Sequence, residues 1–166
     1  MLEQDEKISS IIPILSQAAH SVGSPQIRNR GTVGGNLANA SPAADLAPVF
    51  AVFDAELVLR SVRGTRRLPI DGFLLDSEKT ALERDELLEA VEMDIPHADG
   101  MHFEKFGRRN AQAVARLNGA CWVRWKDEVE HAHGAPRRLE SVRLVIGSAT
   151  PTPIRVRKAE ELLNDS

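Results

Sequence analysis

The sequence has a single cysteine, few aromatic residues and no long apolar run. One cysteine, Cys121, excludes an intrachain disulfide, and it excludes an iron-sulfur cluster or cysteine-rich zinc site held by this chain alone. The longest apolar stretch, residues 46–53, is interrupted by Pro48 and is far shorter than the roughly 20 residues of a membrane-spanning helix. The acidic opening MLEQDEKIS lacks the basic flank and apolar core of a signal peptide, so we expect a cytoplasmic protein with no membrane span.

An excess of basic residues is also missing. Lysine and arginine number 21 against 24 aspartates and glutamates, and no segment has the basic excess that binding to a phosphate backbone requires. We therefore predict that nucleic acid is not a partner. The hydrophobic fraction of 42% and the charged fraction of 27% are those of an ordinary globular protein, and 166 residues allow one domain or two small lobes.

The apolar pattern predicts an α+β chain. Apolar residues at intervals of three and four predict a helix over residues 10–22, with Pro13 in its first turn. We expect two lobes, residues 1–96 and 97–166, with an antiparallel meander in the second. Strands are expected over residues 56–62, 66–70, 87–95, 101–108, 117–129 and 139–146, and further helical segments over 46–53, 71–75 and 156–163.

Residues 24–45 are rich in glycine and asparagine, and they predict a long structured loop of the kind that carries function. Gly31, Gly34 and Gly35 fall within five positions, which allows close approach of a ligand and positive φ. Consecutive amides in such a loop form a nest for a phosphate or pyrophosphate. A glycine-rich turn with no ligand is the alternative. The P-loop lysine and the G-x-G-x-x-G pattern are both absent from this segment, so neither of those nucleotide sites is supported.

Other candidate residues are weaker. His131 and His133 alternate, but no third ligand is suitably spaced, so loop histidines are favoured over a metal site. Cys121 has no neighbouring lysine or helix start to activate it, which favours a core thiol over a nucleophile. Four arginines lie in the expected hairpin: Arg60, Arg63, Arg66 and Arg67. A solvated hairpin face explains them, and a partner-docking surface is the alternative.

The string QIRNRGTVGGNLANASPAADLAP, residues 26–48, closely resembles the signature of the FAD-binding subunit of molybdenum-containing hydroxylases, the family of xanthine dehydrogenase and carbon monoxide dehydrogenase. The resemblance continues in order and spacing through ELVLRSVRGTRRLPIDGF, DELLEAVEMDIP, FEKFGRRNAQAVARLNGA and IGSATPTPIR, over about 140 residues. The xanthine dehydrogenase type is the most similar. The resemblance implies a partial p-cresol methylhydroxylase-type FAD-binding domain over residues 1–96. A small antiparallel C-terminal lobe, truncated at its end, would follow over 97–166.

The same resemblance implies which residues contact FAD. In the family, one loop lies against the FAD diphosphate and neighbouring groups. The residues that match this loop are Thr32, Gly34, Gly35 and Asn36. This assignment agrees with the phosphate nest expected from the glycines alone.

Four further positions match residues that contact other parts of the cofactor. Ser41 and Asp45 match positions near the adenosine ribose, and a helix cap is an alternative or additional role for Asp45. Leu88 matches an apolar residue near the flavin or adenine face, whereas the residue alone predicts an ordinary core leucine. Lys105 matches a lysine near the isoalloxazine, where a cation favours reduced flavin, and its alternative is a solvated strand lysine.

The function implied is that of an electron-transfer subunit with FAD. A molybdenum cofactor in a large partner subunit would hydroxylate the substrate, and two 2Fe-2S clusters in a small partner subunit would pass electrons to FAD and then to NAD or another acceptor. No general base or covalent nucleophile is expected in this chain.

One departure from the family keeps other functions open. The family's N-terminal lobe, with its alanine-glycine-glycine-threonine-type loop, has no counterpart in residues 1–24. One alternative is therefore a truncated, non-catalytic homologue that docks on partner subunits without FAD. A second is a phosphate-ligand binding protein that uses only residues 31–36.

Overall fold

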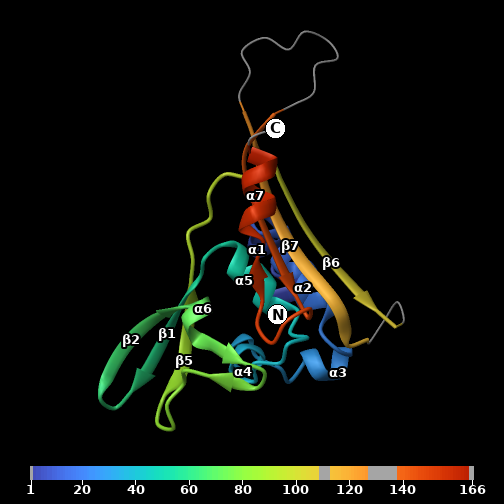
Figure 1. Cartoon of the computed structure of the whole chain (residues 1–166). Coiled ribbons are helices and arrows are strands. Elements are labelled where there is room, and N and C mark those ends of the chain that lie inside the picture. The colour runs from blue at the N-terminus through green and yellow to red at the C-terminus, as the bar shows by residue number, and fades with distance from the viewer. Residues whose placement is uncertain (1, 109–112, 127–137, 165–166) are drawn as a thin grey trace.

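A computed structural model describes residues 2–108, 113–126 and 138–164 of the chain (Figure 1). Its N-terminal part combines short helices with a three-stranded and a two-stranded sheet, and its C-terminal part is a four-stranded sheet with one helix. No helix of the described ranges has the length and apolar character needed to cross a membrane.

The helix expected over residues 10–22 is two helices, α1 (Glu6–Ile11) and α2 (Pro13–Ser21). Pro13 has no amide donor with which to continue α1, and it occupies the first turn of α2. The residue before it, Ile12, is forced out of the helical region, with φ −133° and ψ 71°. The other helical segments of this part are η1 (Leu2–Gln4), α3 (Pro25–Arg28), α4 (Val33–Ala38), α5 (Leu46–Val52) and α6 (Ile70–Phe73).

The expected loop over residues 24–45 contains the two short helices α3 and α4. Ser24 and Thr32 supply the side-chain caps that start them. The prediction of positive φ at Gly34 and Gly35 is wrong, because both glycines lie within α4 and neither has a positive φ. Glycine destabilises the interior of a helix. In this short helix, the Thr32 cap and packing against β5 offset that free-energy cost.

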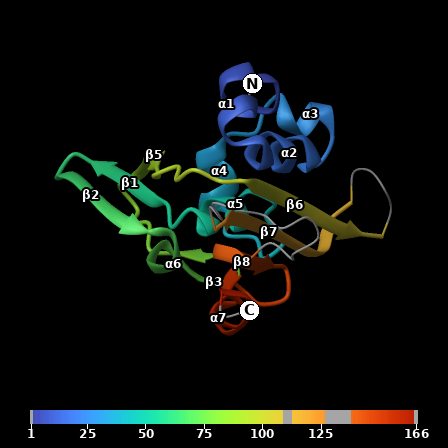
Figure 2. The ribbon, with the colours of Figure 1, turned by 90° about the horizontal axis from the view of Figure 1, so that it is seen from above.

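Two small antiparallel sheets follow α5. The first has the order β2-β1-β5, and the second pairs β3 with β4. Seen from above, the β1–β2 hairpin projects to one side, away from α1, α2 and α3 (Figure 2). The strands are β1 (Glu56–Ser61), β2 (Gly64–Pro69), β3 (Leu74–Asp76), β4 (Lys79–Thr80) and β5 (Leu87–Glu92).

The C-terminal sheet is the expected antiparallel meander, in the order β6-β7-β8-β9. The strand expected to reach Val129 ends at Trp125 in the structure. His131 and His133 fall in residues 127–137, outside the described residues. The elements are β6 (Gly100–Gly107), β7 (Ala115–Trp125), β8 (Leu139–Gly147), β9 (Ile154–Arg155) and α7 (Arg157–Asn164).

The two parts of the chain share one hydrophobic core. Helix α5 packs against β7 and β8, and α2 packs against β6. Phe50 and Val52 from α5 belong to the same buried cluster as Trp122 and Val145 from the meander. The relative position of the two parts is therefore fixed by apolar contacts, and residues from both can contribute to one site.

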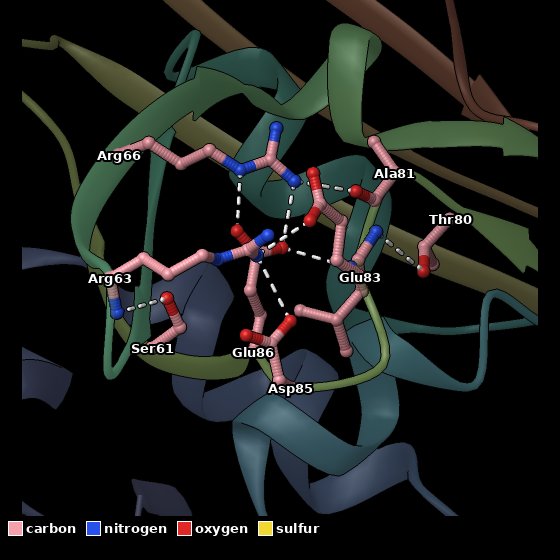
Figure 3. A network of polar contacts seen from close by, with 9 residues as sticks. Ser61, Arg63, Arg66, Thr80, Ala81, Glu83, Asp85 and Glu86 are labelled. Atoms are coloured by element: carbon pink, nitrogen blue, oxygen red, sulfur yellow. Dashed lines mark hydrogen bonds and ion pairs between the residues drawn. The ribbon is translucent and has the colours of Figure 1, made fainter.

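Arg63 and Arg66 of the hairpin are ion-paired with acidic residues before β5 (Figure 3), and Arg60 and Arg67 with acidic residues on β5. Arg66 donates to both carboxylate oxygens of Glu86, at 2.6 and 2.7 Å, and to the carbonyl of Ala81 at 2.7 Å. Because the Glu86 side chain is only 4% exposed, this pair ties the hairpin to the start of β5. The remaining pairs are exposed, as a solvated hairpin face predicts: Arg63 with Glu83 and Asp85, Arg60 with Glu89, and Arg67 with Glu92.

The Glu86 pair makes a testable contribution to acid stability. Hydrogen bonds from the Arg66 guanidinium and the Glu83 amide lower the pKa of Glu86 from 4.5 to about 2. Ionised Glu86 thus stabilises the fold above about pH 4.5, and this contribution is lost as the pH falls towards 2. We expect the difference in unfolding free energy between wild type and Glu86→Gln, measured in urea, to shrink over that interval. Glu89→Gln, in an exposed pair, is the control; a Glu86→Gln difference independent of pH would contradict the prediction.

Candidate functional site

The first group of predicted site residues lies at the start of α4. The Thr32 hydroxyl accepts a hydrogen bond from the Gly35 amide at 2.9 Å, and the Thr32 carbonyl accepts from the Asn36 amide at 3.0 Å. The amides of Val33 and Gly34 have no acceptor within the helix, because they belong to its first turn. Backbone donors of this kind suit a phosphate oxygen.

The two glycines of α4 have different surroundings, and only Gly35 lies in a tight one. A Cβ atom at Gly35 would lie 3.0 Å from the capping oxygen of Thr32. One at Gly34 would lie 3.4 Å from the carbonyl oxygen of Leu88 on β5. The structure therefore places Leu88, which was predicted as a separate cofactor contact, against Gly34 of α4.

Four of the predicted residues line one open groove of about 590 Å³: Thr32, Gly35, Asn36 and Ser41. Apolar side chains of α2 and α5 form part of its wall, including Ala19 and Leu46. Arg30, which the sequence analysis did not single out, also lines the groove. Arg30 is exposed and has no ion pair in the described ranges. Its only sequence signal was its place two residues before Thr32, inside the family-like string.

Asn36 lines this groove and also a small cavity of about 10 Å³ beside Ser41. The side-chain oxygen of Asn36 is buried and has no hydrogen-bond partner among the described residues. Leaving such an acceptor unsatisfied costs roughly 1–3 kcal/mol, and a hydroxyl or amide of a ligand would remove that cost. Backbone donors for an anion beside an acceptor for a hydroxyl fit the diphosphate and sugar groups of a dinucleotide such as FAD.

Asp45 and Lys105 form a buried ion pair across the two parts of the chain. The Asp45 carboxylate contacts the Lys105 ammonium at 2.5 Å and accepts from the Asn118 amide at 3.1 Å. Lys105 also donates to the Ser21 carbonyl at 2.9 Å. The side chains of Lys105 and Asp45 are only 13% and 5% exposed, so the solvated-lysine alternative is wrong. The cap alternative for Asp45 is also wrong, because its side chain makes no capping hydrogen bond to α5.

Lys105 lines a second groove, of about 980 Å³, formed by α2, α3 and β6. Two donors of its ammonium are used by Asp45 and Ser21, and an ammonium has three, so one is left for a ligand. Arg28 lines both grooves. The structure thus places Lys105 at the wall of a second groove. Asp45 lines neither groove and contacts the Lys105 ammonium.

The described residues contain no cluster of three or more histidine, cysteine or acidic side chains that could hold a metal ion. Cys121 on β7 is half-buried, and burial raises the pKa of its thiol. A raised pKa disfavours the reactive thiolate, which agrees with the expected core thiol.

The fold and the glycine-rich groove define a flavin-binding domain, and the chain belongs to the family of FAD-binding subunits of molybdopterin dehydrogenases. Residues 2–98 match the FAD binding domain in molybdopterin dehydrogenase, and residues 101–166 match the CO dehydrogenase flavoprotein C-terminal domain. The expected family and fold class are both confirmed. FAD is the cofactor of this family.

Individual relatives agree with this assignment. A putative xanthine dehydrogenase FAD-binding subunit of Escherichia coli (strain K12) is 37% identical over 153 residues, covering 90% of this chain and 49% of the relative. The 6-hydroxypseudooxynicotine dehydrogenase complex subunit alpha of Paenarthrobacter nicotinovorans is 34% identical over 166 residues, covering 99% and 53%. A carbon monoxide dehydrogenase structure from Hydrogenophaga pseudoflava superposes with a TM-score of 0.82 at 29% identity, covering 99% and 54%. The chain spans about half the length of these relatives.

Proposed function

We propose that this chain contributes the second half of an FAD site in an electron-transfer subunit of a molybdenum-containing hydroxylase. Bound FAD would receive electrons from 2Fe-2S clusters in a small partner subunit and pass them to NAD or another acceptor, while a large partner subunit would hold the molybdenum cofactor. The 37% identity to a xanthine dehydrogenase FAD-binding subunit supports a xanthine dehydrogenase-like complex. A cytoplasmic location and the division at residues 96 and 97 are part of the same proposal.

The observation that carries the proposal is the shared groove of Thr32, Gly35, Asn36 and Ser41 in a chain of this family. The first amides of α4 would hold the diphosphate, and the unsatisfied Asn36 oxygen would accept from a cofactor hydroxyl. Leu88 packs against Gly34 and supports the position of α4. These residues bind and orient the cofactor, and none of them is a general base.

A docking homologue without FAD is the less favoured function. Such a protein would leave the buried Asn36 oxygen without a partner among the described residues, which costs stability. A protein that binds only a phosphate would likewise leave this acceptor unsatisfied, because phosphate at neutral pH mainly accepts hydrogen bonds.

Removing the Thr32 cap tests the proposal. The protein that carries this chain, purified with its partner subunits, is expected to contain FAD. Thr32→Ala should weaken FAD binding about fivefold, since loss of an N-cap costs about 1 kcal/mol and loosens the first amides of α4. FAD release during dialysis, followed by absorbance, measures the change, and Thr65→Ala on the exposed hairpin is the control. A wild-type complex without FAD, or a Thr32→Ala complex with unchanged affinity, would overturn the proposal.

A further inference from the structure

Asn118 is a buried polar residue to which neither the sequence motifs nor the grooves assign a role. It lies on β7 and is 1% exposed. Its amide donates to the Asp45 carboxylate at 3.1 Å and to the Ala44 carbonyl at 3.2 Å. Its oxygen accepts from the Ser148 hydroxyl at 3.4 Å. Both ends of the Asn118 side chain therefore have partners.

The neighbouring strand leaves room for this side chain. Gly147 on β8 pairs with Asn118 across the sheet. A Cβ atom at Gly147 would overlap the Asn118 side-chain oxygen and lie 2.7 Å from Pro48 on α5. Glycine at this position allows the asparagine amide to reach across from the meander to Asp45.

The two oxygens of the Asp45 carboxylate have different partners. One accepts from Asn118 on β7, and the other contacts Lys105 on β6. A neutral amide adds no charge to the ion pair, but it fixes the rotation of the carboxylate. Without Asn118, Asp45 would still attract Lys105, but no other side-chain donor of the described residues would hold its carboxylate in one orientation.

We propose that Asn118 is a positioning residue of the FAD site, which acts through Asp45 to hold the Lys105 ammonium at the wall of the second groove. This inference rests on the proposed function, since Lys105 is taken to face the flavin. Asn118 itself touches no part of either groove. Its effect on a cofactor would pass through Asp45 and Lys105 in sequence.

The first test measures the Lys105 ammonium directly and does not measure the flavin. In the wild-type complex, acylation of Lys105, followed by mass spectrometry, should be slow because two hydrogen bonds hold its ammonium. Asn118→Ala should raise the rate about tenfold, while the exposed Lys79 stays unchanged as an internal reference. Arg124→Ala, which removes an exposed ion pair from the same strand, is the matched control and should leave Lys105 unchanged. Asn118→Leu keeps a similar shape without a donor or a charge, and it serves if the alanine variant does not fold.

The second test separates positioning from a purely structural role. In the FAD-loaded complex, Asn118→Ala should shift the flavin potential in the same direction as Lys105→Met. The double variant should shift it no further than Lys105→Met alone, because both changes act through one ammonium. Additive shifts, or a shift in neither variant, would overturn the inference.

The two tests also distinguish this inference from the proposed function. A wild-type complex that holds no FAD refutes the proposed function and, with it, the role of Asn118 in an FAD site. A complex that holds FAD but shows unchanged Lys105 acylation in Asn118→Ala refutes only the role of Asn118.

Discussion

Replacement of Lys105 by methionine is expected to lower the free energy of unfolding by about 3–5 kcal/mol, because it removes one partner of a buried ion pair. The Asp45 side chain is 5% exposed, and of its partners in the described part of the chain it would keep the Asn118 amide alone. Methionine preserves the length and apolar stem of the lysine, so most of the loss would come from the uncompensated charge. Urea unfolding of the complex, followed for this subunit by hydrogen exchange, measures the change.

The double variant Lys105→Met with Asp45→Asn should recover much of that loss, since asparagine leaves no buried charge. Lys79→Met, at an exposed position, is the matched control and should change stability little. A loss below about 1 kcal/mol in Lys105→Met would contradict the prediction, because losses of that size are typical of exposed ion pairs.

Replacement of Gly35 by valine is expected to remove FAD from the complex while leaving the subunit folded. The added Cβ would lie 3.0 Å from the Thr32 hydroxyl oxygen and its methyl groups would enter the groove. Displacement of the cap costs about 1–2 kcal/mol of stability, which a folded domain tolerates. Flavin absorbance per subunit measures the loss, with molybdenum and iron contents measured in parallel.

Gln26→Val is the control for a β-branched residue in a short helix, because Gln26 is exposed on α3 and lines neither groove. It should keep its FAD. Normal flavin occupancy in Gly35→Val would show that the groove beside α4 does not hold the cofactor, whatever the stability of the variant.

Much of the fold follows from local sequence pattern. The strand expected over residues 56–62 is β1, although three consecutive residues in its middle are buried, and the strand expected over 139–146 is β8. The site residues Thr32, Gly35 and Asn36 could be predicted together because they fall within a single turn of one short segment. The helical form of that segment was missed, because its glycines favour a loop unless a cap and a packing partner stabilise the helix.

The sequence by itself determined the family, the meander and the glycine-rich part of the site, because each is encoded in contiguous residues. Only the tertiary structure decided the environment of Asp45, Lys105 and Asn118. Lys105 is 60 residues from Asp45 along the chain and lies on β6, whereas Asp45 precedes α5, so no local pattern could pair them. Packing of α5 against the meander buries the three side chains together. Lys105 therefore forms a buried ion pair, although the sequence of β6 alone predicts a solvated lysine.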